Sequence, residues 1–195
     1  MIRGKRSTKS KWYDRTSQRP GYEVTGAKGD NGEDIVWKLC EKEGWEYESY
    51  LDRDSQVNRK IDGKIKGKLI DVKNNMFKGS WHGIELDKYR RGDGQGWFNT
   101  TEAEQIYAVN EKTKSVFVYS IKKMRKVVED LIERSPHRYK RLSKSSDNTA
   151  WGVYIDFHYI KWNTWEVYDS RDEKVIEEEQ EKISKELREC FAHAI

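Results

Sequence analysis

The chain has 195 residues, of which 37% are charged and 35% hydrophobic, and its formal net charge is +4. This length suits one domain with or without appendages, and the 8 Trp and 11 Tyr can enlarge a core that is otherwise lean. No apolar run reaches the length of a membrane span, and no hydrophobic segment follows the basic N-terminus. We therefore expect neither an anchor nor a signal peptide, and a cytoplasmic protein.

The two cysteines support the same location. Cys40 and Cys190 are far apart and lack the spacing of metal ligands, and each falls in a helical apolar pattern. We expect buried free thiols, which fit a reducing compartment.

The N-terminal part predicts an arm followed by a helix. Residues 1–24 are polar, basic and without periodicity, and they end near Pro20-Gly21. After a glycine-bearing stretch at 26–32, a helix is expected to run to Gly44. Its apolar stripe consists of Ile35, Val36, Leu39 and Cys40.

Three strands are expected next, and a long loop follows them. They are predicted near 45–51, from about 57 to 65 and at 68–73, and Lys66-Gly67 suits a tight turn between the last two. Residues 74–99 are rich in glycine and aromatic residues and predict a long loop, and such loops are usually functional or disordered.

The rest of the chain predicts alternating helices and strands. Thr101 and Glu104 match a capping box, which predicts a helix through Val109. The order helix, three strands, helix, strand, helix indicates an α/β sandwich with a mixed sheet. The further predicted elements are strands at 115–120, 151–160 and 164–168 and helices at 121–134 and 172–195.

The segment around the predicted tight turn contains the residues that suggest chemistry. Side chains alternate along a strand, so Asp71 and Lys73 share one face. If Lys66-Gly67 is a two-residue turn, Asp62 lies opposite Asp71, and like charges roughly 5 Å apart destabilise a sheet. A divalent cation explains that pairing: both carboxylates, a carbonyl near Val72 and waters would suit Mg²⁺. A three-residue turn would instead move the pairing to Gly63.

A charged hairpin with one face in water is the alternative. Against it, the apolar neighbours of Asp71 indicate a central strand, where an unpaired carboxylate is costly. Glu33, in the predicted first helix, is a third carboxylate that could reach the same place. It could equally be a favourable charge in a first helical turn.

The run from Gly32-Glu33 through Asp62 to Asp71-Val72-Lys73 resembles the PD-(D/E)xK nuclease superfamily, in the branch of archaeal Holliday-junction resolvases and phage nucleases. The stretch Gln56–Asp62 also resembles a strand of phage members in which a Gln precedes the metal-binding Asp. Lys60-Ile61 stands where a Pro is nominal, and Asp52 and Asp54 could compete for the ligand role.

The resemblance implies a restriction-endonuclease-like core, with a central mixed sheet flanked by helices, over about residues 25–134. It places the nuclease domain at 25–170, between the arm of 1–24 and a C-terminal helix at 171–195. The implied activity is metal-dependent hydrolysis of DNA, possibly of branched or recombining DNA, with Mg²⁺ or Mn²⁺ as cofactor, by a protein that could be phage-encoded. The implied catalytic residues are Glu33, Asp62, Asp71 and Lys73, and the implied metal ligands are Asp62, Asp71 and Val72.

Basic clusters fit a nucleic-acid partner, although each cluster alone could be solvated surface. Trp81, Trp97 and Phe98 in the long loop could stack on bases or pin the loop to the core. The residues we expect at DNA are Arg3, Lys5, Arg6, Lys9 and Lys11 in the arm and Lys122, Lys123, Arg125 and Lys126 in the helix 121–134.

The predicted C-terminal helix has a near-heptad apolar stripe. It could pack on its own domain or form a homodimer, as junction resolvases do. A non-catalytic nucleic-acid-binding protein that keeps a nuclease fold is the rival to the enzyme.

Overall fold

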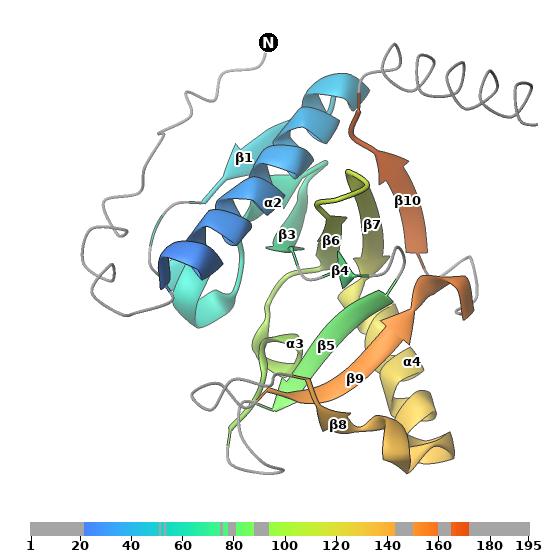
Figure 1. The fold of residues 1–195 in the computed structure, drawn as a ribbon. Coiled ribbons are helices and arrows are strands. Elements are labelled where there is room, and N and C mark those ends of the chain that lie inside the picture. Colours follow the sequence, from blue (N-terminus) through green and yellow to red (C-terminus); the bar gives the residue numbers. More distant parts are fainter. Residues whose placement is uncertain are drawn as a thin grey trace, which may run out of the picture.

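The computed structural model describes residues 22–50, 52, 54–74, 76–77, 81–87, 94–142, 150–159 and 165–171 (Figure 1). Within these ranges the chain is a mixed α/β protein with two sheets. Residues 1–21 of the predicted basic arm, which include Arg3, Lys5, Arg6, Lys9 and Lys11, lie outside the described residues, as does the predicted helix 172–195. The last three residues of the predicted arm, 22–24, instead begin helix α2.

The larger sheet has six strands in the order β1-β2-β3-β6-β7-β10, and the smaller has four in the order β4-β5-β9-β8. Strands β3 and β6 are parallel and the other paired neighbours are antiparallel, so the larger sheet is mixed. The strands are Tyr47–Ser49 (β1), Gly63–Ile65 (β2), Lys68–Lys73 (β3), Met76–Phe77 (β4), Trp81–Asp87 (β5), Gln105–Asn110 (β6), Ser115–Ser120 (β7), Lys140–Arg141 (β8), Trp151–Asp156 (β9) and Trp165–Asp169 (β10). The helices are Tyr22–Glu43 (α2), Trp97–Thr100 (α3) and Ile121–Arg134 (α4), with a π-helix at Asp54–Arg59 (η1) and 3-10 turns at Pro136–Arg138 (η2) and Phe157–Tyr159 (η3).

Strands β3 and β7 and helix α4 have the predicted bounds. The bounds of β1 and β10 are within two residues of the predicted ones, and β9 begins at the predicted residue but ends at Asp156. These elements have an uninterrupted apolar run or a clear period. The α/β class with a mixed sheet is thereby confirmed.

Helix α2 buries the predicted apolar stripe of Ile35, Val36, Leu39 and Cys40. It ends at Gly44, whose φ of +66° is left-handed, and the Trp45 N–H donates to the Cys40 carbonyl at 2.8 Å. The helix begins at Tyr22, so the prediction of irregular structure at 26–32 is wrong. At Gly32 a Cβ would lie 2.9 Å from the Cβ of Asn74, so glycine here allows the helix to approach the end of β3.

The turn between β2 and β3 has the predicted two residues. Lys66 and Gly67 have φ of +50° and +78°, as a type I′ turn requires, and Ile65 pairs with Lys68. The hairpin register is therefore the one that directs Asp62 towards Asp71.

The predicted strand 57–65 is correct only at its end. Residues Asp54–Arg59 form a π-helix, in which the Ile61 N–H donates to the Ser55 carbonyl at 2.8 Å. The Asp52 carboxylate accepts the Ser55 N–H at 2.8 Å, a local contact that competes with strand formation.

The predicted helix from Thr101 to Val109 is wrong, since β6 occupies this segment. The capping residues bind elsewhere: the Thr101 hydroxyl donates to the Lys60 carbonyl at 2.8 Å, and the Glu104 carboxylate accepts the Leu69 N–H at 3.0 Å. Both residues therefore connect segments that are far apart in the sequence.

The predicted long loop 74–99 contains β4, β5 and α3 among its described residues. The connection between the parallel strands β3 and β6 thus passes through the smaller sheet (Figure 1). Parallel strands are usually joined by a long helix, whereas the helix in the described part of this connection, α3, has four residues.

The larger sheet separates two cores. On one face α2 packs on a cluster that includes Ile70, Tyr107 and Val118. On the other face, α4 and the inner face of the smaller sheet enclose the second cluster, which includes Ile84, Ile106 and Phe157. Residues on β3 therefore face either α2 or the smaller sheet.

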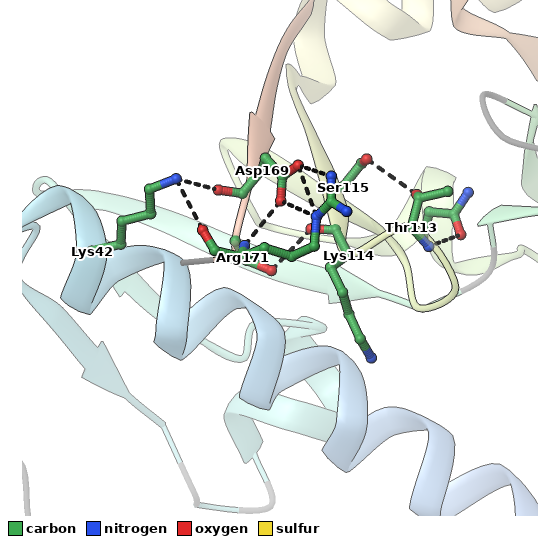
Figure 2. Close-up of polar contacts among 8 residues, drawn as sticks. Lys42, Thr113, Lys114, Ser115, Asp169 and Arg171 are labelled. Atoms are coloured by element: carbon green, nitrogen blue, oxygen red, sulfur yellow. Dashed lines mark hydrogen bonds and ion pairs between the residues drawn. The ribbon is translucent and has the colours of Figure 1, made fainter. Parts of the chain in front are cut away.

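A polar cluster fastens the end of β10 (Figure 2). The Lys42 ammonium donates to the carbonyls of Asp169 and Arg171, both at 3.1 Å, and Arg171 forms an ion pair with Asp169 at 2.6 Å. Ser170 donates to the Lys114 carbonyl through its N–H and its hydroxyl. Helix α2, strand β10 and the β6–β7 turn are thereby joined.

None of the helices in the described part of the chain is both long and apolar enough to cross a membrane.

Gly63→Ala should destabilise the protein more than Gly67→Ala. A Cβ at Gly63 would lie 2.3 Å from the Glu48 carbonyl oxygen, whereas a Cβ at Gly67 meets no atom within 4 Å. We expect losses of about 3 kcal/mol at Gly63, from overpacking against backbone, and about 1 kcal/mol at Gly67, from its left-handed φ. Urea unfolding measures both, and equal losses would contradict the close approach of β1 and β2.

Candidate metal centre

Strand β3 presents Asp71 and Lys73 to the core beneath the smaller sheet. Asp71 pairs with Ile106 on β6, and Ile106 pairs with Tyr119 on β7. Both of these partners belong to the cluster enclosed by α4 and the smaller sheet. The predicted shared face of Asp71 and Lys73 is consistent with this register.

Asp62 precedes β2 and is fixed through its backbone on two sides. Its N–H donates to the Ile70 carbonyl at 2.9 Å, and its carbonyl accepts the Tyr50 N–H at 2.8 Å. Its Oδ2 accepts the Val72 N–H at 2.6 Å. This last bond orients the Asp62 carboxylate along β3, beside Asp71.

Asp71 is 1% exposed and has a buried oxygen, Oδ2, without a hydrogen-bond partner. Burial raises the pKa of Asp71 to about 8; Lys73 opposes this shift, and the nearby Asp62 carboxylate adds to it. A second cation beside Asp71 would favour the ionised form.

The Lys73 ammonium forms an ion pair with Oδ1 of Asp71. Burial lowers the pKa of Lys73, but the carboxylates of Asp71, Asp62 and Glu85 outweigh burial and raise it. Lys73 is therefore protonated at neutral pH in the metal-free protein. The ammonium also lies over the ring of Trp97, 5.1 Å from its centroid.

Glu33 is on α2, which packs on the opposite face of the sheet from Asp71. Its carboxylate and that of Asp62 both act on Tyr47, whose pKa is raised first by burial and then by these two charges. Within the described residues, no three His, Cys, Asp or Glu side chains are grouped as a metal site would require. The structure thus brings together Asp62, Asp71 and Lys73, whereas Glu33 lies on the helix that covers the other face of the sheet and shares with Asp62 an effect on Tyr47.

The donor set fits a hard cation. Asp62 and Asp71 supply carboxylate oxygens, and the unpartnered Oδ2 of Asp71 needs a cation or a proton. Val72, predicted as a carbonyl ligand, contributes an N–H that orients Asp62. Asp52 and Asp54, the predicted competitors, accept hydrogen bonds from Ser55 and Asn58 within the segment of the π-helix.

Two buried side chains that no sequence motif identifies, His82 and Tyr119, interact electrostatically with Lys73 and Asp71. His82 is fully buried, and its Nε2 lies 2.9 Å from the Tyr119 hydroxyl, while its Nδ1 has no hydrogen-bond partner. Burial and the Lys73 charge lower the pKa of His82 to about 3. His82 and Tyr119 are 37 residues apart, and neither lies in a motif that would have identified the pair.

The predicted nucleic-acid residues of α4 fall into two groups. Lys122, Lys123 and Lys126 are exposed. Arg125 is partly buried and donates to the carbonyls of Phe98 and Thr101, so it fastens α3. Phe98 is 1% exposed and Trp97 packs against the same core, which favours the pinning role predicted for these rings.

Comparisons of the chain with protein-family models, with curated proteins and with solved structures gave no match.

Acid should destabilise the protein through His82. The pKa of His82 is about 3 in the folded protein and near 6.5 when unfolded, so below pH 6.5 the unfolded chain binds an extra proton. The stability present above pH 6.5 is lost as pH falls towards 3, at about 1.4 kcal/mol per pH unit. When urea unfolding is measured between pH 6 and 4, the free energy of unfolding should fall with pH less steeply in His82→Gln than in the original protein, by this amount. His137→Gln, at an exposed position, is the control and should keep the slope; equal slopes in all three proteins would contradict the prediction.

Proposed function

We propose that this protein is a metal-dependent nuclease of the PD-(D/E)xK type that hydrolyses phosphodiester bonds in DNA. The observation that carries the proposal is the buried, unpartnered Oδ2 of Asp71, beside the Asp62 carboxylate and the Lys73 ammonium. Two carboxylates and one lysine around the β2–β3 hairpin are the groups that this chemistry uses, and a buried carboxylate oxygen without a partner is rare in a purely structural ion pair.

Each residue has a distinct task in this proposal. Asp62 and Asp71 would hold Mg²⁺, or Mn²⁺, and the Val72 N–H keeps Asp62 oriented towards it. The bound ion would polarise the scissile phosphate and stabilise the charge of the transition state. Lys73 would orient the attacking water and exchange a proton with it.

The charge distribution of α4 supports a polyanionic substrate. Its first turn has no acidic residue and includes Lys122 and Lys123, whereas Glu129 and Glu133 lie in its second half. This order opposes the helix dipole, and an anion at the N-terminal end would compensate it. DNA phosphates are such anions.

Two backbone hydrogen bonds link this basic end of α4 to strand β3. The Ile121 N–H donates to the Glu104 carbonyl at 3.1 Å, and the Glu104 N–H donates to the Leu69 carbonyl at 2.8 Å. Leu69 is two residues before Asp71 on the same strand. A DNA backbone bound at α4 would therefore pass near the candidate metal centre.

Asp71→Asn and Lys73→Met should each abolish cleavage. In Mg²⁺ or Mn²⁺ we expect the original protein to cleave at least one of linear, circular, nicked and four-way-junction DNA. Either variant should be slower by about 10³-fold or more, because several kcal/mol of transition-state stabilisation are lost. Cleavage is measured on end-labelled DNA, and DNA binding is measured in parallel and should persist.

The cluster of Figure 2 supplies matched controls. Asp169→Asn and Lys42→Met remove the same side-chain types from the end of β10, where Asp169 binds Arg171 and Lys42 binds two carbonyls. Both controls should cleave normally. Full cleavage by Asp71→Asn would refute the proposal, and DNA binding without cleavage in the original protein would indicate the non-catalytic alternative.

Neutralising the basic end of α4 should weaken DNA binding at every sequence. In the double variant Lys122→Gln/Lys123→Gln, we expect the slope of log K against log salt concentration to fall by about 1 to 2, since each lost phosphate contact removes about 0.9. Fluorescence anisotropy over a salt series measures the slope. Lys38→Gln/Lys112→Gln changes the net charge equally at exposed positions elsewhere and should retain it; equal slopes for the two double variants would contradict a DNA contact at α4.

A further inference from the structure

The Lys73 ammonium has a second contact besides Asp71. Its Nζ lies 5.1 Å from the centroid of the Trp97 ring, within the range of a cation–π interaction. The Lys73 side chain is 22% exposed and that of Asp71 is 2% exposed. We infer that Trp97 is a positioning residue, whose ring holds the Lys73 ammonium at the Asp71 carboxylate; its importance for cleavage rests on the proposed function.

The Trp97 ring is fixed by the core below it. It packs edge-on against Phe98, with ring centroids 5.6 Å apart, and it lies 6.1 Å from the His82 ring. Phe98 and His82 are 1% and 0% exposed. These two buried neighbours therefore restrict the Trp97 ring on the sides where they pack.

The backbone around Trp97 is fixed as well. The Gly96 N–H and the Asn99 amide both donate to the Leu86 carbonyl, at 2.7 Å and 2.9 Å. A Cβ at Gly96 would lie 2.5 Å from the Glu85 carbonyl oxygen, so glycine allows α3 to lie directly against β5. Arg125 adds a bond from α4 to the Phe98 carbonyl at 3.1 Å. Strand β5 and helix α4 thus hold the backbone on both sides of Trp97.

An aromatic partner solves a particular electrostatic problem. An ammonium held by Asp71 alone would lose much of that attraction when a metal ion shared the carboxylate, and the two cations would repel each other. The face of an indole ring attracts the ammonium without taking a carboxylate oxygen from the ion. His82, below the ring, is neutral because burial and Lys73 lower its pKa to about 3, so it adds no further repulsion.

The contact can be tested without any cleavage assay. In protein labelled with ¹³C at the lysine ε-carbons, a ring above Lys73 should shift its signal upfield, and Lys73→Arg assigns that signal. Trp97→Leu should abolish the shift in the metal-free protein, and Trp97→Phe should retain part of it. Trp45→Leu is the matched control, because the Lys66 ammonium lies 3.6 Å from the Trp45 centroid. It should move the Lys66 signal and leave that of Lys73; an unchanged Lys73 signal in Trp97→Leu overturns the inference.

Kinetics then separate positioning from a contact with substrate. For Trp97→Leu we expect kcat to fall by about 3- to 30-fold, the equivalent of one cation–π contact, with KM changed by less than about twofold. Trp97→Phe should recover most of kcat, and Trp45→Leu should keep all of it. Unchanged kcat, or a rise in KM alone, would reject positioning and indicate stacking on bases. If the original protein cleaves none of the DNA panel, the proposed function fails, while the lysine signals still decide whether Trp97 holds Lys73.

Discussion

The free-energy cost of burying the Asp71 carboxylate is the main physical constraint on the candidate metal centre. Asp71 lies on β3 in a row with Ile106 and Tyr119, between a sheet and the layer that covers it. One ammonium neutralises one of its oxygens, and the other oxygen is left without a partner. A carboxylate in such surroundings is stable only with a proton or a cation, and the metal site that we propose rests on this requirement.

The smaller sheet has a role at this site as well as in the core. Because β3 and β6 are parallel, the chain must cross over between them, and it does so through β4, β5 and α3. The crossing brings His82 beneath the sheet and Trp97 beside Lys73. In this protein the connection itself thus supplies side chains to the candidate metal centre.

The sequence allowed prediction wherever the determinants are local. Lys66-Gly67 predicts its turn because the two residues suit left-handed φ, α4 follows from its helical period, and β7 follows from its uninterrupted apolar run. The hairpin register, and with it the approach of Asp62 to Asp71, follows from that turn. The helix predicted from Thr101 and Glu104 was wrong because the side chains of these residues bind Lys60 and Leu69, which are distant in sequence. The contact between His82 and Tyr119 could not be predicted from the sequence for the same reason, since the packing of the two sheets brings these distant residues together.

The fastening at the end of β10 determines how the molecule would respond to mechanical load. Among the strands of the described residues, β10 is at the edge of the larger sheet and pairs with β7. A force pulling at Arg171 would first strain the two bonds from Lys42, because they hold the last carbonyls of the strand to α2. The load is thereby shared between a helix and a sheet. Strand β10 would then separate from β7, beginning at Asp169, only after the Lys42 bonds broke.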